Sequence, residues 1–200
     1  MSIRIDVDRI RRALGAPGDT KHLPVAGENH AAVAAVLRDG ETGAEVLLIR
    51  RAEHELDPWS GHMAFPGGRF DPEDIDLLTT AVRETQEELG LDLKTNASLL
   101  GPLERVPAIA RGRRVGMTIA PFVFALERPG PLSPNEEVVE AIWAPLEVLA
   151  RGENATSVAF ELEGEKLQLP GWDVDGRIVW GLTYRMLKAL LEKLEPPDHA

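Results

Sequence analysis

Three glutamates on one turn of a predicted helix are the residues of this chain whose spacing best suits chemistry. Glu84, Glu87 and Glu88 stand at i, i+3 and i+4 in a helical pattern over Asp76 to Leu89, so they share one side of that helix. Like charges at this spacing cost roughly 0.2–0.5 kcal/mol per pair, and no lysine at matching spacing relieves them. A hard divalent cation such as Mg²⁺ or Mn²⁺ would remove that cost. The alternative interpretation is an acidic helix face in solvent.

A glycine pair precedes this helix and favours the metal site over the surface interpretation. Gly67 and Gly68 lie in a stretch from Ala52 to Pro72 that is rich in glycine and proline, which predicts a surface loop. Glycine adopts backbone conformations closed to other residues, and it lets a metal or ligand come close to the main chain. Loop and helix together therefore predict a metal-binding site.

Composition restricts the class of ligand. The 200 residues carry 22 Lys plus Arg against 33 Asp plus Glu, a net charge of -11, and they include no cysteine. This acidity argues against DNA or RNA polymers, whereas a small polyanionic substrate stays compatible if a metal ion offsets the charge locally. Any metal must be held by carboxylates or histidines. The sequence shows no signal peptide and no apolar run of membrane-spanning length, so we expect a soluble cytoplasmic protein with no membrane partner.

The elements that must position these residues follow from periodicity. We expect a single α+β domain over residues 1–200, with a mixed sheet between helices and an N-terminal helical extension over residues 1–22. Helical patterns cover residues 5–14, 76–89, a short stretch after Pro145, and 178–194. Strand patterns cover residues 31–38 and 46–49 as a hairpin, then 99–106, 117–126 and 138–143, and 158–162 with 166–169 as a late hairpin.

Residues 65–91 resemble the signature of the Nudix hydrolases. Gly68 is followed after five residues by Asp74, then after eight residues by Arg83-Glu84, and the segment ends with Glu87-Glu88 before Gly90-Leu91. The family pattern has a glutamate in place of Asp74, seven residues before the Arg-Glu pair, and an apolar residue where this chain has Thr85. The resemblance implies a Nudix-type α/β/α sandwich with a mixed central sheet. It also implies metal-dependent hydrolysis of a pyrophosphate bond in a nucleoside diphosphate linked to another moiety.

The extra residue after Asp74 resembles the coenzyme A pyrophosphatase branch of that family. The segments 47–52 and 61–65 and the tetrapeptide 180–183 also match that branch, whereas Leu56 stands where it has an arginine and one residue is added before Gly61. The resemblance makes coenzyme A or a derivative the first substrate, with ADP-ribose or another nucleoside diphosphate sugar as the alternative. A non-catalytic nucleotide-binding sensor and an acidic interaction module are alternatives of other classes.

The resemblance also assigns candidate roles. Glu87 and Glu88 are the main metal ligands, Glu84 is a third ligand or the base that activates water, and a main-chain carbonyl of Gly67 or Gly68 is a candidate to complete the metal shell. Arg83 is expected to face away from the metal and to form a structural ion pair with Asp74.

Each of the remaining candidates has a structural alternative. Glu136 and Glu137 would add a late carboxylate or simply face solvent, and the arginines at 50 and 51 would bind phosphate or lie at a strand edge. Phe65 would contact substrate or fill the core. Trp59 would stack on a base or fill the core. The last group could act in the site or lie on the surface: His54, His62 and the basic cluster Arg111, Arg113 and Arg114. A homodimer would use the first and last helices.

Overall fold

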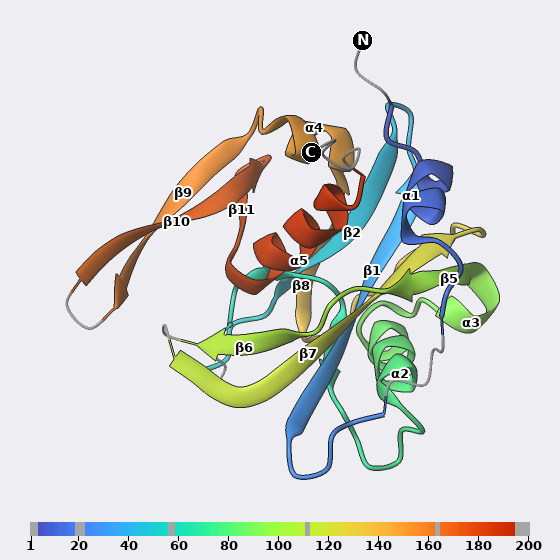
Figure 1. Cartoon of the computed structure of the whole chain (residues 1–200), viewed down its shortest axis with the longest axis horizontal. Helices are drawn as coiled ribbons and strands as arrows, with labels where there is room; N and C mark the ends of the chain where they lie inside the picture. Colours follow the sequence, from blue (N-terminus) through green and yellow to red (C-terminus); the bar gives the residue numbers. More distant parts are fainter. Residues whose placement is uncertain (1–3, 19–22, 56–58, 111–112, 163–164, 195–200) are drawn as a thin grey trace, which may run out of the picture.

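The computed structural model describes residues 4–18, 23–55, 59–110, 113–162 and 165–194. A central sheet carries helices on both faces, and a smaller three-stranded sheet extends to one side (Figure 1). None of the helices in the described ranges combines the length and apolar character of a bilayer span.

The central sheet is built around two parallel strands. Strand β1 (Asn29–Asp39) runs parallel to β7 (Arg113–Leu126) and antiparallel to β2 (Ala44–Arg51). The main path of the sheet is β3-β2-β1-β7-β5, with β4 paired to β1, β6 to β7 and β8 to β2. The bounds of these further strands are β3 Met63–Ala64, β4 Gly67–Arg69, β5 Ala97–Pro102, β6 Val106–Ala110 and β8 Val138–Pro145. The sheet is mixed, as the sequence predicts.

Side-chain alternation along β1 creates two hydrophobic layers. Ala31, Ala35 and Leu37 join the layer that includes residues of α1 (Val7–Leu14) and α5 (Gly181–Glu192). The intervening residues 32, 34 and 36 join the opposite layer, which includes residues of α2 (Leu77–Leu89). Successive strand residues point to opposite faces, so this nearly continuous apolar run needs cover on both sides. The expected α/β/α arrangement is confirmed.

Helix α2 has well-defined ends. The Asp76 side chain accepts a hydrogen bond from the backbone N–H of Thr79 at the start, and Gly90, in the left-handed conformation with φ of 65°, ends the helix. Both signals are local, which is why the sequence predicts this helix within one residue. The short helix α3 (Leu93–Asn96) was not predicted, whereas α4 (Leu146–Arg151) follows Pro145 as expected.

The three-stranded sheet shows that the predicted start of the last helix was wrong. Strands β9 (Ala155–Leu162) and β10 (Glu165–Val174) form the expected late hairpin, but residues 177–180 form a third strand, β11 (Arg177–Trp180). The last helix therefore begins at Gly181 and not at residue 178. Branched and aromatic residues at the end of β11 pair with β10, and this pairing outweighs the helical periodicity.

The stretch from Ala52 to Pro72 is also more ordered than a surface loop. It contributes β3 and β4 to the central sheet, and Met63 and Phe65 are buried. The prediction was wrong here because glycines and prolines reduce strand propensity locally, whereas pairing with β1 and β2, far away in sequence, supplies the hydrogen bonds. Leu56 lies outside the described residues.

Candidate active site

Carboxylates of helix α2 lie directly against β4, which we call the glycine strand because it contains Gly67 and Gly68. The Glu88 side chain is buried, and its Oε2 accepts a hydrogen bond of 2.8 Å from the backbone N–H of Gly67. A Cβ atom at Gly68 would lie 2.4 Å from Cδ of Glu84, and one at Gly67 would lie 2.3 Å from the carbonyl oxygen of Ala32. Gly67 also has φ of 148°, which side-chain-bearing residues rarely adopt. The glycine pair is thus the space that lets the helix carboxylates reach the strand backbone.

Burial favours the protonated forms of Glu84 and Glu88. Desolvation raises the pKa of Glu88 to about 8, although the Gly67 hydrogen bond and the nearby charge of Arg51 oppose the rise. Desolvation also raises the pKa of Glu84. The charge of Glu137 adds to the upward shift at both residues, so Glu137 belongs to the same electrostatic cluster. A cation placed among these groups would favour their ionised forms.

Arg83 is the cation that the structure places there. Its Nη1 lies 2.9 Å from Oε1 of Glu84 and 3.0 Å from Oε2 of Glu87. Its Nε and Nη2 also donate to the two carboxylate oxygens of Asp74, at 3.0 and 2.9 Å. The expected contact with Asp74 is therefore present, but the expectation that Arg83 faces away from the glutamates was wrong. The long side chain of Arg83 reaches Asp74 and the glutamates together. Its i, i+4 spacing to Glu87 reduces the repulsion between the glutamates, which no lysine at matching spacing does.

Asp74 holds Arg83 in place from a nearly enclosed position. Its side chain is only 4% exposed, and Thr80 Oγ1 donates a hydrogen bond of 2.8 Å to it. Burial alone raises the pKa of Asp74, but the hydrogen bonds from Arg83 and Thr80 outweigh that effect and bring the pKa below its usual value. Asp74 is therefore ionised at neutral pH and anchors the loop to α2.

The donor chemistry of this cluster fits a hard divalent cation. Among the described residues, no three His, Asp or Glu side chains converge on one point as ligands. Glu88 is turned to the Gly67 amide, while Glu84 and Glu87 are turned to Arg83. These side chains supply only oxygen donors, and a single guanidinium neutralises part of their charge.

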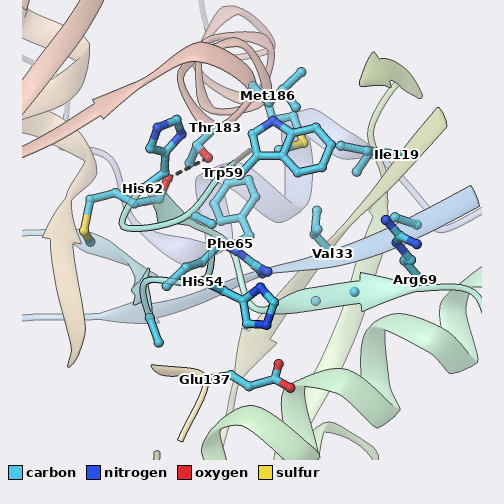
Figure 2. A pocket seen from close by; sticks show the side chains of 18 of the residues that line it. Val33, His54, Trp59, His62, Phe65, Arg69, Ile119, Glu137, Thr183 and Met186 are labelled. Atoms are coloured by element: carbon cyan, nitrogen blue, oxygen red, sulfur yellow. Dashed lines mark hydrogen bonds between the residues drawn. The ribbon is translucent and has the colours of Figure 1, made fainter. Parts of the chain in front are cut away.

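A cavity of about 740 Å³ lies beside the glycine strand (Figure 2). Arg51 lines it, as do Glu136, Glu137 and the glycine pair. Arg50 does not line it, because its Nε bonds to Glu140 at 2.9 Å. The pairing of β2 with β8 shifts register between Arg50 and Arg51, so the two arginines have different surroundings. Arg51 is thus better placed for substrate than Arg50.

The other sequence candidates divide between the cavity and its surroundings. Phe65 lines the cavity but is only 1% exposed, so it forms part of the wall and of the core at once. His54, His62 and Trp59 all line it as well. Arg113 is exposed outside the cavity lining. Arg111 and the side chain of Arg114 fall outside the described part of the chain.

Several cavity residues carry no signal in the sequence. Arg69, Met117, Ile119 and Met186 come from β4, β7 and α5 and meet only in the folded chain. None of them belongs to a motif with a regular spacing, so only their shared cavity marks them.

A NUDIX domain family model matches residues 28–161, which include the glycine strand, helix α2 and the segment with Glu137. The chain belongs to the NUDIX domain family. Nudix hydrolase 22, chloroplastic, of Arabidopsis thaliana is 30% identical over 162 residues, covering 78% of this chain and 52% of that protein. The uncharacterized Nudix hydrolase NudL of Yersinia pestis is 29% identical over 150 residues, covering 74% of this chain and 72% of that protein.

Another relative extends the comparison beyond proteins named as Nudix hydrolases. An uncharacterized protein, C14C4.10c of Schizosaccharomyces pombe, is 41% identical over 119 residues, 58% of this chain and 36% of that protein. The chain thus spans about a third to just over half of the first relatives it matches.

Solved structures show the same Nudix fold. The NUDIX domain of Shewanella oneidensis NrtR, solved as a complex with ADP ribose, has a TM-score of 0.54 and 17% identity, covering 86% of this chain and 91% of that one. A Caenorhabditis elegans Ap4A hydrolase has a TM-score of 0.51 and 23% identity, covering 62% of this chain and 84% of that one.

Proposed function

We propose that this Nudix chain hydrolyses the pyrophosphate bond of a nucleoside diphosphate joined to another moiety, with Mg²⁺ or Mn²⁺ as cofactor. The observation that carries the proposal is the cluster of Glu84, Glu87 and Glu88 packed on Gly67–Gly68 beside a cavity large enough for a nucleotide. Nudix hydrolases in general use divalent metals, and this cluster offers hard oxygen donors.

In this proposal the glutamates have two roles, metal binding and acceptance of a proton from water. The metal would be held by Glu87 and Glu88, together with Glu84 and a main-chain carbonyl of the glycine pair. Glu137, directly before β8, would add a further carboxylate. A divalent cation held there supplies positive charge that neutralises phosphate oxygens and makes water more acidic. Water attacks one phosphorus, the bridging P–O bond breaks, and the bridging oxygen leaves with the other phosphate. Glu84 is our candidate to accept the proton of the attacking water.

Arg83 would act as a positioning residue in this scheme. Its hydrogen bonds to Asp74 fix the loop, and its contacts with Glu84 and Glu87 would be exchanged for the metal. Arg51 would attract the substrate phosphates, because it lines the cavity next to the buried Glu88.

Coenzyme A or a derivative is the first substrate we propose, on the spacing after Asp74 and the match at residues 47–52. ADP-ribose and other nucleoside diphosphate sugars are the competing class. A sensor would not need the full set of three glutamates. Cytoplasmic location and a homodimer remain predictions from the sequence.

The decisive experiment measures Mg²⁺- and Mn²⁺-dependent cleavage by purified variants. We expect Glu87→Gln and Glu88→Gln each to lower kcat/KM at least a hundredfold with unchanged folding, whereas Glu73→Gln, at an exposed loop carboxylate, leaves it unchanged. Full activity in both helix variants would reject the metal site. Parallel kcat/KM values for coenzyme A and ADP-ribose decide the substrate class.

A further inference from the structure

Three of the four methionines of this chain line the same cavity. Met63, Met117 and Met186 come from β3, β7 and α5, which are far apart in sequence. We call the part of the cavity that they form the methionine chamber; it is lined by Trp59, Met63, Met117, Ile119 and Met186. Thioether side chains are apolar and flexible, so such a wall adapts to apolar groups of varied shape.

The apolar side chains of Trp59, Ile119 and Met186 and the carboxylate of Glu137 lie at different ends of the cavity. Figure 2 shows Trp59, Ile119 and Met186 close together at one end. Glu137 lies at the other end, near helix α2, with His54 between them. One ligand that places a pyrophosphate beside the glycine strand would therefore direct its substituent toward an apolar wall.

Several polar groups around the chamber have partners within the protein, and Arg69 is a charged side chain that lines the cavity beside Trp59 and Met117. The hydroxyl of Thr183 donates a hydrogen bond of 2.9 Å to the carbonyl of Met63, and the indole N–H of Trp59 donates one of 3.1 Å to the carbonyl of Ile109. The ring of His62 packs against Trp180 at 4.9 Å between centroids. Apart from Arg69, the wall offers the hydroxyls of a sugar few partners in place of water, and this loss disfavours binding.

We infer that the methionine chamber receives an apolar chain or ring, so that the substrate is a nucleoside diphosphate whose second substituent ends in an apolar group and is not a sugar, which among the proposed substrates favours a coenzyme A derivative that carries such a group. The inference rests on the proposed function, because it takes the scissile pyrophosphate to lie at the carboxylate end. The inference adds a preference for one kind of second substituent, because the glutamate cluster by itself would act on the pyrophosphate whatever that substituent is.

A series of substrates tests this directly on the wild-type protein. ADP esterified at its β-phosphate with methyl, butyl and hexyl alcohols keeps the pyrophosphate constant while the apolar chain grows. We expect kcat/KM to rise about fourfold per methylene group until the chamber is full, the factor that corresponds to about 0.8 kcal/mol per buried CH₂. ADP-ribose should be cleaved more slowly than the hexyl ester. A rate independent of chain length, or a preference for ADP-ribose, would overturn the inference.

Calorimetric binding of the same esters separates this inference from the proposed function. If affinity rises with chain length while no ester is cleaved, the chamber is confirmed and the hydrolase proposal fails. If all esters are cleaved with equal affinity and rate, the hydrolase proposal stands and the chamber is rejected.

Variants of Met117 provide the structural control, because this residue is only half-buried and a substitution there is tolerated more easily. Met117→Gln places an amide in the wall and should reduce the hexyl-to-methyl ratio of kcat/KM about tenfold. Met117→Leu keeps the wall apolar and should preserve most of the ratio. Equal ratios in the two variants would contradict the assignment of the wall, and the wild-type series decides the matter if the Gln variant does not fold.

Discussion

Gly68 is the position where a single methyl group should disable the site and leave the fold intact. In Gly68→Ala, the new Cβ would lie 2.4 Å from Cδ of Glu84 and 2.5 Å from each of its carboxylate oxygens. Gly68 does not have a positive φ, so alanine adopts its backbone conformation without strain. The three nearest atoms all belong to the end of this flexible side chain.

The size of the effect follows from the displacement. An ordinary van der Waals contact is about 3.4 Å or more, so the Glu84 carboxylate must retreat by about 1 Å. Misplacement of a reacting or metal-binding group by about 1 Å can cost about a hundredfold in rate. Replacing glycine by alanine at a compatible position also lowers the entropy of the unfolded chain. We therefore expect kcat/KM to fall about a hundredfold while the free energy of unfolding changes by less than about 1 kcal/mol.

The matched control is the neighbouring glycine. In Gly67→Ala the Cβ would meet backbone atoms of β1, the Ala32 carbonyl oxygen at 2.3 Å and the Val33 Cα at 2.6 Å, at φ of 148°. Neither atom can rotate away, so we expect destabilisation by about 2–4 kcal/mol from overpacking and backbone strain. Urea unfolding and Mg²⁺-dependent cleavage, measured on both variants, give the comparison. A fully active Gly68→Ala protein would refute the reasoning, because Glu84 would then not need its observed position.

Two further predictions concern charge in the cluster. Because the pKa of Glu88 is about 8 when folded against a usual 4.5, the folded state keeps a proton between these values that the unfolded chain releases, so the stability of the metal-free protein should fall as pH rises from 4.5 to 8. Urea unfolding at pH 5 and 8 in a chelator checks this, and an equal decline in Glu88→Gln would contradict it. Arg83→Ala should cost about 2–3 kcal/mol in urea unfolding, since it leaves the carboxylate of Asp74, with a side chain 4% exposed, without its cation. Stability equal to wild type would show that the pair does not anchor the loop.

Local signals in the sequence were sufficient for helix α2 and its glutamates. The cap at Asp76 and the stop at Gly90 are encoded within a few residues of the helix ends, and periodicity places Glu84, Glu87 and Glu88 on one side. The hairpin of β1 and β2 could also be predicted, because its strand and turn patterns are local. The resemblance to Nudix hydrolases added the expected reaction, metal-dependent hydrolysis of a pyrophosphate bond.

Other features depended on distant partners. The glycine strand β4 exists because β1 supplies its hydrogen bonds, and β11 replaces the first turn of a predicted helix because β10 lies beside it. Arg83 reaches Asp74 and the glutamates together, an arrangement that helical geometry alone did not predict.

The sequence by itself determined which carboxylates share a helix face, because that relation is fixed by the 3.6-residue repeat of one element. Only the tertiary structure decided which apolar side chains line the cavity. Met63, Met117 and Met186 belong to three elements, and their meeting depends on how strands and helices pack across the chain. The grouping of the glutamates is thus a local property of the chain, whereas the lining of the cavity is a property of the fold.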